Sequence, residues 1–299
     1  MGQSHLECDQ ERSWELIVRK ILIGLCTNIL MILGIGFYAT EIEPKALSVT
    51  RIDIENKYVQ KSFDGMTIVQ FSDTHLGPDY TVDQLQSLVD RMNLMKPDIV
   101  VFTGDLMDHY AQYGSKNRKL AQKVLAKIEA PFGKYAVYGN HDRGGGGSRL
   151  YKEYMEEAGF MVLVNEVHSI ISATGERMNI AGLDDFLLGK PMIERTLQSL
   201  RAQDFNLLLV HQPDVADRFT DYPVDLQLSG HSHGGQVRIP FLQPLITTSL
   251  GNKYIEGLYS LEGKIRPLTL YVNRGIGTTR LPVRLFEKPE LTVIRLVSQ

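Results

Sequence analysis

Two histidines stand one residue apart in the stretch GHSH, at residues 230–233, directly after the strand-like run VDLQLS. Residues i and i+2 of a strand point to one face, and in a loop after a strand two such imidazoles can converge on one point or on two adjacent points. Neutral imidazole is the commonest metal ligand, although a single histidine is more often a surface residue or a satisfied core residue. His231 and His233 therefore raise the hypothesis of a metal site, which the rest of the chain must test.

Polar groups of the same kind end several other predicted strands. The apolar runs MTIVQF, DIVVF, YAVY and NLLLV each indicate a buried strand, and histidine, aspartate or asparagine follows each run. Sites in open α/β sheets form outside the carboxyl ends of strands, so these side chains are expected to lie together. Each motif alone is weak, since an aspartate after a strand is commonly a turn residue. Together they predict a metal site at these strand ends, where the motifs are Asp73-x-His75, Gly104-Asp105, Gly139-Asn140-His141-Asp142, His211 and Gly230-His231-x-His233.

Amphipathic helices alternate with these strands. Apolar residues recur at helical spacing in the segments 81–96, 115–130, 148–160 and 191–202. This alternation predicts an α/β domain. From residue 224 onward the pattern changes to strands and turns, with LTLYV and LTVIRL as the clearest strands. The glycines at 144–147 are interpreted as a mobile loop and not as a phosphate cradle, because no GxxxxGK pattern surrounds them.

The ordered set of motifs resembles the calcineurin-like metallophosphoesterases, over the chain from Met66 to its end. The resemblance implies a four-layer α/β/β/α sandwich, in which helices cover two central sheets. It also implies two metal ions, with one bound by Asp73, His75 and His233, the other by Asn140, His211 and His231, and Asp105 between them. His141 would not bind metal but would face the phosphate as the catalytic residue. The apolar N-terminal segment and the ending YVNRGIGTTRLPVRLFEKPEL resemble a membrane-tethered bacterial branch that includes hydrolases of UDP-diacylglucosamine.

The chemistry of these side chains is consistent with that resemblance. Imidazole, carboxylate and amide oxygen together suit divalent Mn, Fe, Zn or Co. Two such ions about 3.5–4 Å apart need one carboxylate that uses both oxygens, and they make a shared water available as hydroxide near neutral pH. A histidine cation can then protonate the leaving alkoxide or stabilise the phosphoryl oxygens. The expected reaction is hydrolysis of a phosphomonoester or phosphodiester by metal-bound hydroxide.

The N-terminal region carries an uncharged apolar segment at residues 21–39. As a helix it would span about 28 Å, close to the hydrocarbon thickness of a bilayer. A cleaved signal peptide is disfavoured, because bulky Phe37 lies at the −3 position before Ala39. Arg19 and Lys20 adjoin the start of the segment, whereas basic residues after it lie farther away, so the N-terminus is expected in the cytoplasm and the domain outside. Both cysteines, Cys8 and Cys26, precede the domain, which excludes a disulfide framework or a thiolate site within it.

The predicted organisation is a short tail (1–20), a transmembrane anchor (21–39), a connector with a first strand (40–65) and a metallophosphoesterase domain (66–299). The net charge of -3 gives no sign of a nucleic-acid partner, and no protein partner is predicted. A catalytically silent membrane-tethered scaffold remains an alternative, as does a dimetal nuclease. A dimetal amidohydrolase is disfavoured, because the first strand ends in DTH and not in HxH.

The substrate is expected to be a phosphoester, with the membrane anchor favouring a lipid-linked or envelope compound. The apolar residues Phe241, Leu242, Leu245 and Ile246 could line an acyl path, but core positions are the favoured interpretation. Arg274, Arg280 and Arg284 could bind a second phosphate, and surface or packing roles are equally consistent with the sequence.

Overall fold

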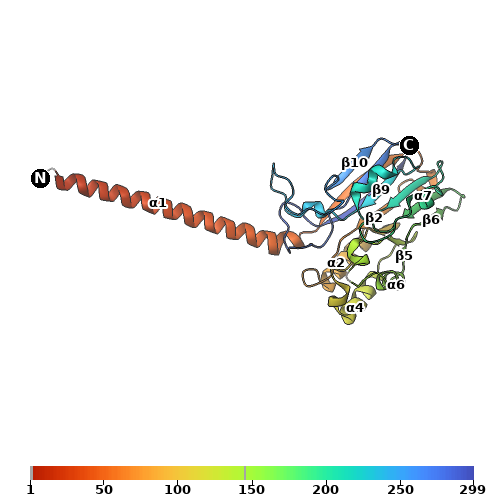
Figure 1. Cartoon of the computed structure of the whole chain (residues 1–299), viewed down its shortest axis with the longest axis horizontal. Coiled ribbons are helices and arrows are strands. Elements are labelled where there is room, and N and C mark those ends of the chain that lie inside the picture. The colour runs from red at the N-terminus through yellow and green to blue at the C-terminus, as the bar shows by residue number, and fades with distance from the viewer. Residues whose placement is uncertain (1–2, 145) are drawn as a thin grey trace.

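A long helix leads into a folded domain in the computed structural model, which describes residues 3–144 and 146–299, with side chains from residue 14 onward (Figure 1). The helix, α1 (Gln3–Phe37), extends away from the domain, and its apolar window has a mean hydropathy of 2.1 and no buried residues. Within the described chain it is the one helix long and apolar enough to cross a membrane. Gly145, in the predicted glycine loop, lies outside the described residues.

The junction between α1 and the domain is fixed by hydrogen bonds. The chain passes through a π-turn, η1 (Tyr38–Ile42), and a 3-10 turn, η2 (Glu43–Lys45). The carbonyl of Ala39 accepts a hydrogen bond from the backbone N–H of Arg284 at 2.9 Å. The buried carboxylate of Glu43 accepts the N–H groups of Phe286, at 2.9 Å, and Glu287. The end of the helix is therefore held against the segment that contains Arg284.

The first sheet has six strands in the order β1-β12-β2-β3-β4-β5. Strands β2 to β5 are parallel, β12 is antiparallel to β2, and β1 pairs parallel with β12 at the edge. The strands are β1 (Ser48–Asn56), β2 (Thr67–Phe71), β3 (Ile99–Phe102), β4 (Lys134–Ala136), β5 (Phe160–Val162) and β12 (Glu290–Ser298). The helices of this half are α2 (Val82–Leu94), α3 (Tyr110–Tyr113), α4 (Ser115–Leu125), α5 (Asn140–Arg143) and α6 (Leu150–Glu157).

The second sheet also has six strands, in the order β10-β11-β9-β8-β7-β6. Strands β7, β8, β9 and β11 are parallel, and antiparallel hairpin partners form both edges. The strands are β6 (Glu166–Ile171), β7 (Arg177–Gly182), β8 (Phe205–Leu209), β9 (Leu226–Ser229), β10 (Gly257–Leu261) and β11 (Leu268–Val272). The helical turns α7 (Ile193–Leu197) and η4 (Pro213–Phe219) belong to this half.

Three apolar cores separate four layers. Ile68 and Val101 of the first sheet pack with Leu207 of the second in a core between the sheets. On each strand the alternate residues face outward, as Val69 does toward the core that contains α2 and α4. The corresponding outer core of the second sheet includes α7 and η4. These layers confirm the predicted α/β/β/α sandwich. The central strands are buried on both faces, which explains why their sequences are continuous apolar runs.

The three arginines that the sequence offers as possible phosphate-binding residues, Arg274, Arg280 and Arg284, have different environments. Arg284 is fully buried, and its guanidinium donates to the carbonyls of Arg274, Gly275, Gly277 and Glu287. The side chain of Arg274 lies near the carboxylates of Glu290, at 3.1 Å, and Glu287, at 3.4 Å. Both of these arginines therefore serve the fold, whereas Arg280 is exposed.

The four apolar residues after the histidine pair do not share one environment. Ile246 is buried, whereas Phe241, Leu242 and Leu245 are exposed, so the core interpretation is wrong for these three residues.

Replacing Arg284 with methionine is expected to lower the free energy of unfolding by about 3–5 kcal/mol, because several buried carbonyls lose their donor. Thermal unfolding of the detergent-solubilised chain measures this change. Arg280→Met is the matched control and should unfold like the unchanged protein. Equal stability of the two variants would contradict the structural role of Arg284.

Candidate metal centre

The loops after five parallel strands bring together all eight residues that the sequence singles out. Asp73 and His75 follow β2, Asp105 follows β3, and Asn140 and His141 open α5 after β4. His211 follows β8, and His231 and His233 follow β9 in the second sheet. Six of the eight line a cavity of about 140 Å³, and Asp73 and His211 lie directly beneath them within 4 Å of cavity residues. Both sheets thus contribute to one site at the carboxyl ends of their strands.

One half of the site contains Asp73, His75 and His233. Their potential ligand atoms lie within 4.8 Å of one another, and all three residues are buried. Nε2 of His75 and Nε2 of His233 face each other at 3.1 Å, and Nε2 of His233 lies 3.4 Å from Oδ1 of Asp73. A carboxylate oxygen and two imidazole nitrogens around one point form a partial coordination sphere for a divalent cation.

The other half contains Asp105, His211 and His231, which form a second buried group within the same 4.8 Å limit. Nε2 of His211 lies 3.2 Å from Oδ2 of Asp105 and 3.1 Å from Nδ1 of His231. Oδ2 of Asp105 also lies 3.7 Å from Nε2 of His75, which belongs to the first group. Asp105 therefore stands between the two groups.

Unpaired polar atoms test whether cations fit here. The amide oxygen of Asn140 is buried with no hydrogen-bond donor. Two pairs of imidazole nitrogens face each other at 3.1 Å. In the pair of His211 and His231 each ring has its other nitrogen on a backbone carbonyl, so neutral rings would place two acceptor nitrogens against each other. Buried polar atoms are costly unless they are satisfied. A pair of divalent cations would bind all of these atoms, so the residues present fit a dimetal centre.

The local electrostatics favour the cation-binding protonation states of Asp105, His231 and His233, but not that of His211. Burial opposes ionisation of Asp105, but His211, His141 and His75 together outweigh it and hold the pKa of Asp105 well below its usual range. Burial also disfavours charge on His211, yet the Asp105 carboxylate raises the pKa of His211 to about 10. Burial lowers the pKa of His231 to about 4 and the pKa of His233 well below its usual value. The carboxylate is thus anionic and these two rings neutral, and a cation at Asp105 would displace the His211 proton.

His141 has a different position from the other histidines. Its Nδ1 lies 2.9 Å from the carbonyl oxygen of Asp108, which leaves Nε2 as the ring nitrogen that can face the cavity. Its backbone N–H donates to Oδ1 of Asp105 at 2.8 Å, so the loop that carries it is tied to the centre. Burial opposes charge on the ring, but Asp105 and Asp108 raise the pKa of His141 above its usual value.

The backbone of the site adopts unusual conformations. Asp73, His75, Asp105, His231 and His233 all have positive φ, between 43° and 70°. Such conformations are uncommon for residues with a Cβ, and they concentrate at functional sites where the surrounding structure imposes them. Gly230 is required for close approach, because a Cβ there would collide with the side chains of Ser72 and Asp73.

Several supporting residues were not singled out as functional by the sequence analysis. The carboxylate of Asp142 accepts the N–H groups of Asp105, Leu106 and Gly139 and the hydroxyl of Tyr110. Nδ1 of His211 lies 2.7 Å from the Thr103 carbonyl, and Nε2 of His231 lies 2.7 Å from the Ser249 carbonyl. Such partners fix ring orientation. Of these partners, only Asp142 could have been noticed in the sequence, as the last residue of the GNHD motif. The carbonyl partners are backbone groups, so no residue type in the sequence indicates them.

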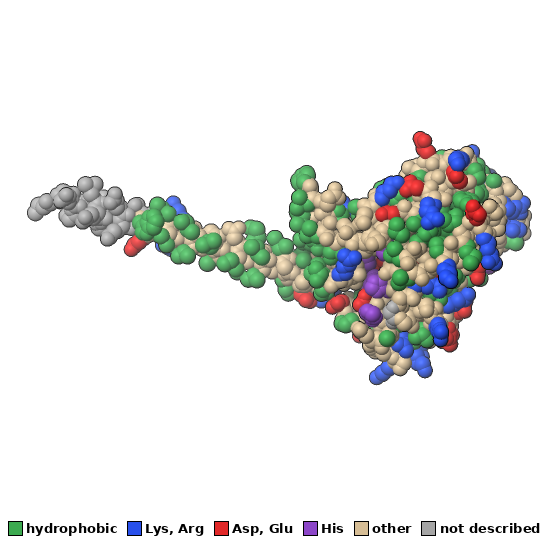
Figure 2. Space-filling view, viewed as in Figure 1, with side chains coloured by type: hydrophobic (Ala, Val, Ile, Leu, Met, Phe, Trp, Pro, Cys, Tyr) green, Lys and Arg blue, Asp and Glu red, His purple; other side chains and the backbone are tan. Residues whose placement is uncertain are grey.

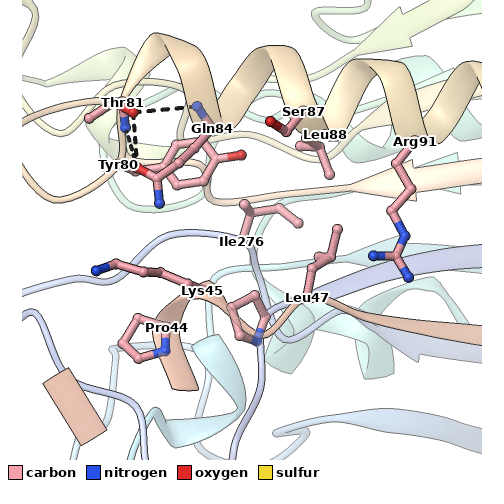
Figure 3. A pocket seen from close by; sticks show the side chains of 11 residues that line it. Pro44, Lys45, Leu47, Tyr80, Thr81, Gln84, Ser87, Leu88, Arg91 and Ile276 are labelled. Atoms are coloured by element: carbon pink, nitrogen blue, oxygen red, sulfur yellow. Dashed lines mark hydrogen bonds between the residues drawn. The ribbon is translucent and has the colours of Figure 1, made fainter. Parts of the chain in front are cut away.

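A larger cavity lies apart from the metal centre. It has a volume of about 470 Å³ and lies between α2 and the junction after α1, as Figure 3 shows. Tyr80, Leu88 and Ile276 give it an apolar lining, and none of the eight site residues reaches it. The candidate site residues therefore lie at the smaller cavity, apart from this one.

Comparison with known proteins identifies a family and its relatives. Calcineurin-like phosphoesterase is the family that matches residues 66–235. The chain is 45% identical to an uncharacterized metallophosphoesterase of Bacillus subtilis, YkuE, over 87% of this chain and 89% of that protein. It is 31% identical to an uncharacterized metallophosphoesterase of Aquifex aeolicus, over 88% of this chain and 96% of that protein. It is also similar to the UDP-2,3-diacylglucosamine pyrophosphatase LpxG of Chlamydia muridarum, at 27% identity over 88% of this chain and 93% of that protein.

Replacing Asp105 with asparagine is expected to reduce the bound metal from about two ions per chain to about one or fewer, because its carboxylate lies beside both groups of candidate ligands. Elemental analysis of the purified protein measures the metal content. Asp90→Asn, at an exposed position on α2, is the control and should leave it unchanged. Two ions per chain in the Asp105 variant would show that this carboxylate does not bridge them.

Proposed function

The chain belongs to the calcineurin-like phosphoesterases, and from that premise we propose that it is a membrane-anchored dimetal phosphohydrolase whose substrate is a lipid-linked phosphoester. That the protein is a phosphoester hydrolase follows from the family. The observation that carries the proposal of two metals is the pair of facing histidine groups on either side of Asp105, with the buried oxygen of Asn140 beside them.

Each ligand is proposed from its place in the site. Asp73, His75 and His233 would hold one cation, and Asn140, His211 and His231 the other. Asp105 would bridge the two, because its oxygens lie near both groups. The cations would supply an activated water and neutralise charge on the phosphoryl oxygens. Their identity is proposed as Mn, Fe, Zn or Co, on the basis of the mixed nitrogen and oxygen ligands.

The protein's own contribution to the chemistry centres on His141. As the water oxygen bonds to phosphorus and the phosphorus–oxygen bond of the leaving group breaks, the leaving oxygen needs a proton. Burial opposes charge on His141, but Asp105 and Asp108 raise its pKa, which favours the protonated ring, and the Asp108 carbonyl orients that ring. Arg280, which also lines the cavity, is positioned to bind a phosphate oxygen of the substrate.

The substrate class rests on two observations. α1 is apolar and unburied over a length that suits a membrane span, and we propose that it anchors the domain outside the cytoplasm. A relative along most of the chain is named for a diacylated sugar nucleotide. A catalytically silent scaffold is the alternative, but none of the eight expected site residues has been lost.

The deciding assay offers the purified full-length chain, loaded with Mn, a panel of phosphomonoesters, phosphodiesters and UDP-2,3-diacylglucosamine. Turnover of an acylated phosphoester in preference to its deacylated counterpart is the expected result. Preference for the deacylated compounds would remove the lipid-linked proposal, and no turnover of any ester would favour the scaffold.

Replacing His141 with alanine is expected to keep both metals but to lower kcat by roughly 10²–10⁴-fold, because the leaving group loses its proton donor. A p-nitrophenyl ester should lose less activity than an alkyl phosphoester, since p-nitrophenolate departs with little protonation. Steady-state kinetics with both esters, together with elemental analysis, test this expectation. Equal losses would assign His141 to the phosphoryl oxygens, and a lost metal would make it a ligand.

A further inference from the structure

An exposed apolar surface lies beside the base of α1. Its members are Phe241, Leu242 and Leu245, from the loop after β9, together with Leu281 and Phe286; we call it the apolar ridge. The side chain of Phe241 is fully exposed, and the other four residues are 57–65% exposed. Figure 2 shows apolar side chains on a projection next to the point where α1 meets the domain. Soluble proteins commonly expose single apolar side chains, whereas a contiguous group of exposed apolar side chains marks an interaction site.

Hydrogen bonds show that the ridge is one surface. Arg238 donates its N–H to the Leu285 carbonyl at 2.9 Å, and Leu285 donates to the Gln236 carbonyl at 2.9 Å. The buried side chain of Gln236 donates to the carbonyls of Leu281 and Val283. The start of the loop after β9 is therefore joined to residues 281–285 of the segment 279–287, which brings the two stretches of chain that carry the apolar residues side by side.

The same segment 279–287 is joined to the end of α1. Arg284 donates to Ala39, and Phe286 donates to Glu43, as described for the junction. Phe37, at the last turn of α1, is 61% exposed and Ile42 is 46% exposed, so apolar surface continues from the helix to the ridge. A helix that enters a bilayer at this point would place the ridge at the surface of the same bilayer.

The charges around the ridge suit a lipid surface. The segment 236–250 contains no acidic residue, and its one basic residue, Arg238, is partly exposed and lies 3.4 Å from the carboxylate of Glu256. Arg280, in the other segment, is exposed, and an exposed basic residue beside apolar ones fits the region where phosphate headgroups meet acyl chains. A soluble protein partner would need no relation to α1, whereas a bilayer explains why the exposed apolar residues adjoin the end of that helix.

We propose that the apolar ridge inserts into the headgroup region of the bilayer that α1 spans, so that the catalytic cavity opens onto the lipid surface. The two segments that carry the ridge also supply Thr248, Ser249, Thr279 and Arg280 to the cavity. Insertion of about 5–10 Å, the depth usual for interfacial apolar side chains, brings this rim to the headgroups. The phosphoester of an amphiphile then reaches the metal centre while its acyl chains stay in the membrane. The inference rests on the proposed membrane anchorage and refines the proposed substrate class.

Tryptophan fluorescence tests the insertion without any measurement of activity. Trp14 is the only tryptophan of the chain, so Trp14→Phe gives a background for single reporters. Phe241→Trp reports on the ridge, and Leu30→Trp, in α1, reports on the anchor. Leu94→Trp is the matched control, because Leu94 is 83% exposed. Leu94 is the last residue of α2, at the end of the domain opposite the metal centre. Each full-length variant is placed in phosphatidylcholine–phosphatidylglycerol nanodiscs, with either brominated acyl chains or aqueous iodide as quencher.

The ridge reporter is expected to lose most of its emission to brominated lipid and little to iodide, and the control reporter to show the reverse. Iodide quenching of the ridge reporter equal to that of the control reporter would overturn the proposal, because the ridge would then lie in water. Shielding of the ridge reporter from both quenchers would also overturn it, in favour of a protein surface such as a second copy of the chain. If brominated lipid does not quench the reporter in α1, the proposed membrane anchorage is itself wrong. If it quenches the reporter in α1 but not the ridge reporter, the anchorage is supported and the proposed insertion of the ridge is wrong.

Discussion

The carboxylate of Asp105 is the constraint on which the rest of the site depends. It follows β3 of the first sheet, yet its Oδ2 lies 3.2 Å from His211 of the second sheet, and its Oδ1 accepts the N–H of His141. Both sheets must therefore place their carboxyl ends at one edge, with the loops at close contact. The buried core between the sheets fixes that arrangement, because alternate apolar residues of each sheet pack against the other.

Burying so many polar groups away from water is energetically costly, and hydrogen bonds within the site offset part of that cost. Asp142 accepts two backbone N–H groups of the Asp105 loop and one from Gly139 in its own loop, and carbonyl oxygens orient His211 and His231. Five candidate ligand residues are held at positive φ, an arrangement that persists only where surrounding contacts impose it. The amide oxygen of Asn140 and the facing imidazole nitrogens remain for the proposed cations to bind. Binding of those cations would couple to completion of the fold in this region.

The position of the site relative to the N-terminal helix bears on how a substrate would arrive. The segment 279–287 contacts three regions: the end of α1 through Arg284, the loop after β9 through Leu285, and the cavity through Thr279 and neighbouring Arg280. A bilayer-bound helix, an apolar surface and the catalytic cavity would then be parts of one continuous structure. In such an arrangement the orientation of the domain on the membrane is set by the fold and not by a flexible linker, which a phosphoester embedded in the membrane requires.

The sequence alone determined the layered fold class and singled out the residues that the fold gathers in the candidate metal centre. Buried strands and amphipathic helices have local periodicities, and polar residues at strand ends stand out against apolar runs, so Asp73 and His231 were visible without coordinates. Local pattern could not separate exposed Arg280 from buried Arg284, whose guanidinium bonds nearby carbonyls and whose backbone N–H donates to the distant Ala39 carbonyl at the end of α1. It also favoured the core for Phe241, which the structure exposes, because burial depends on which distant segments pack above a residue. Only the tertiary structure decided these points, since each depends on contacts between segments far apart along the chain.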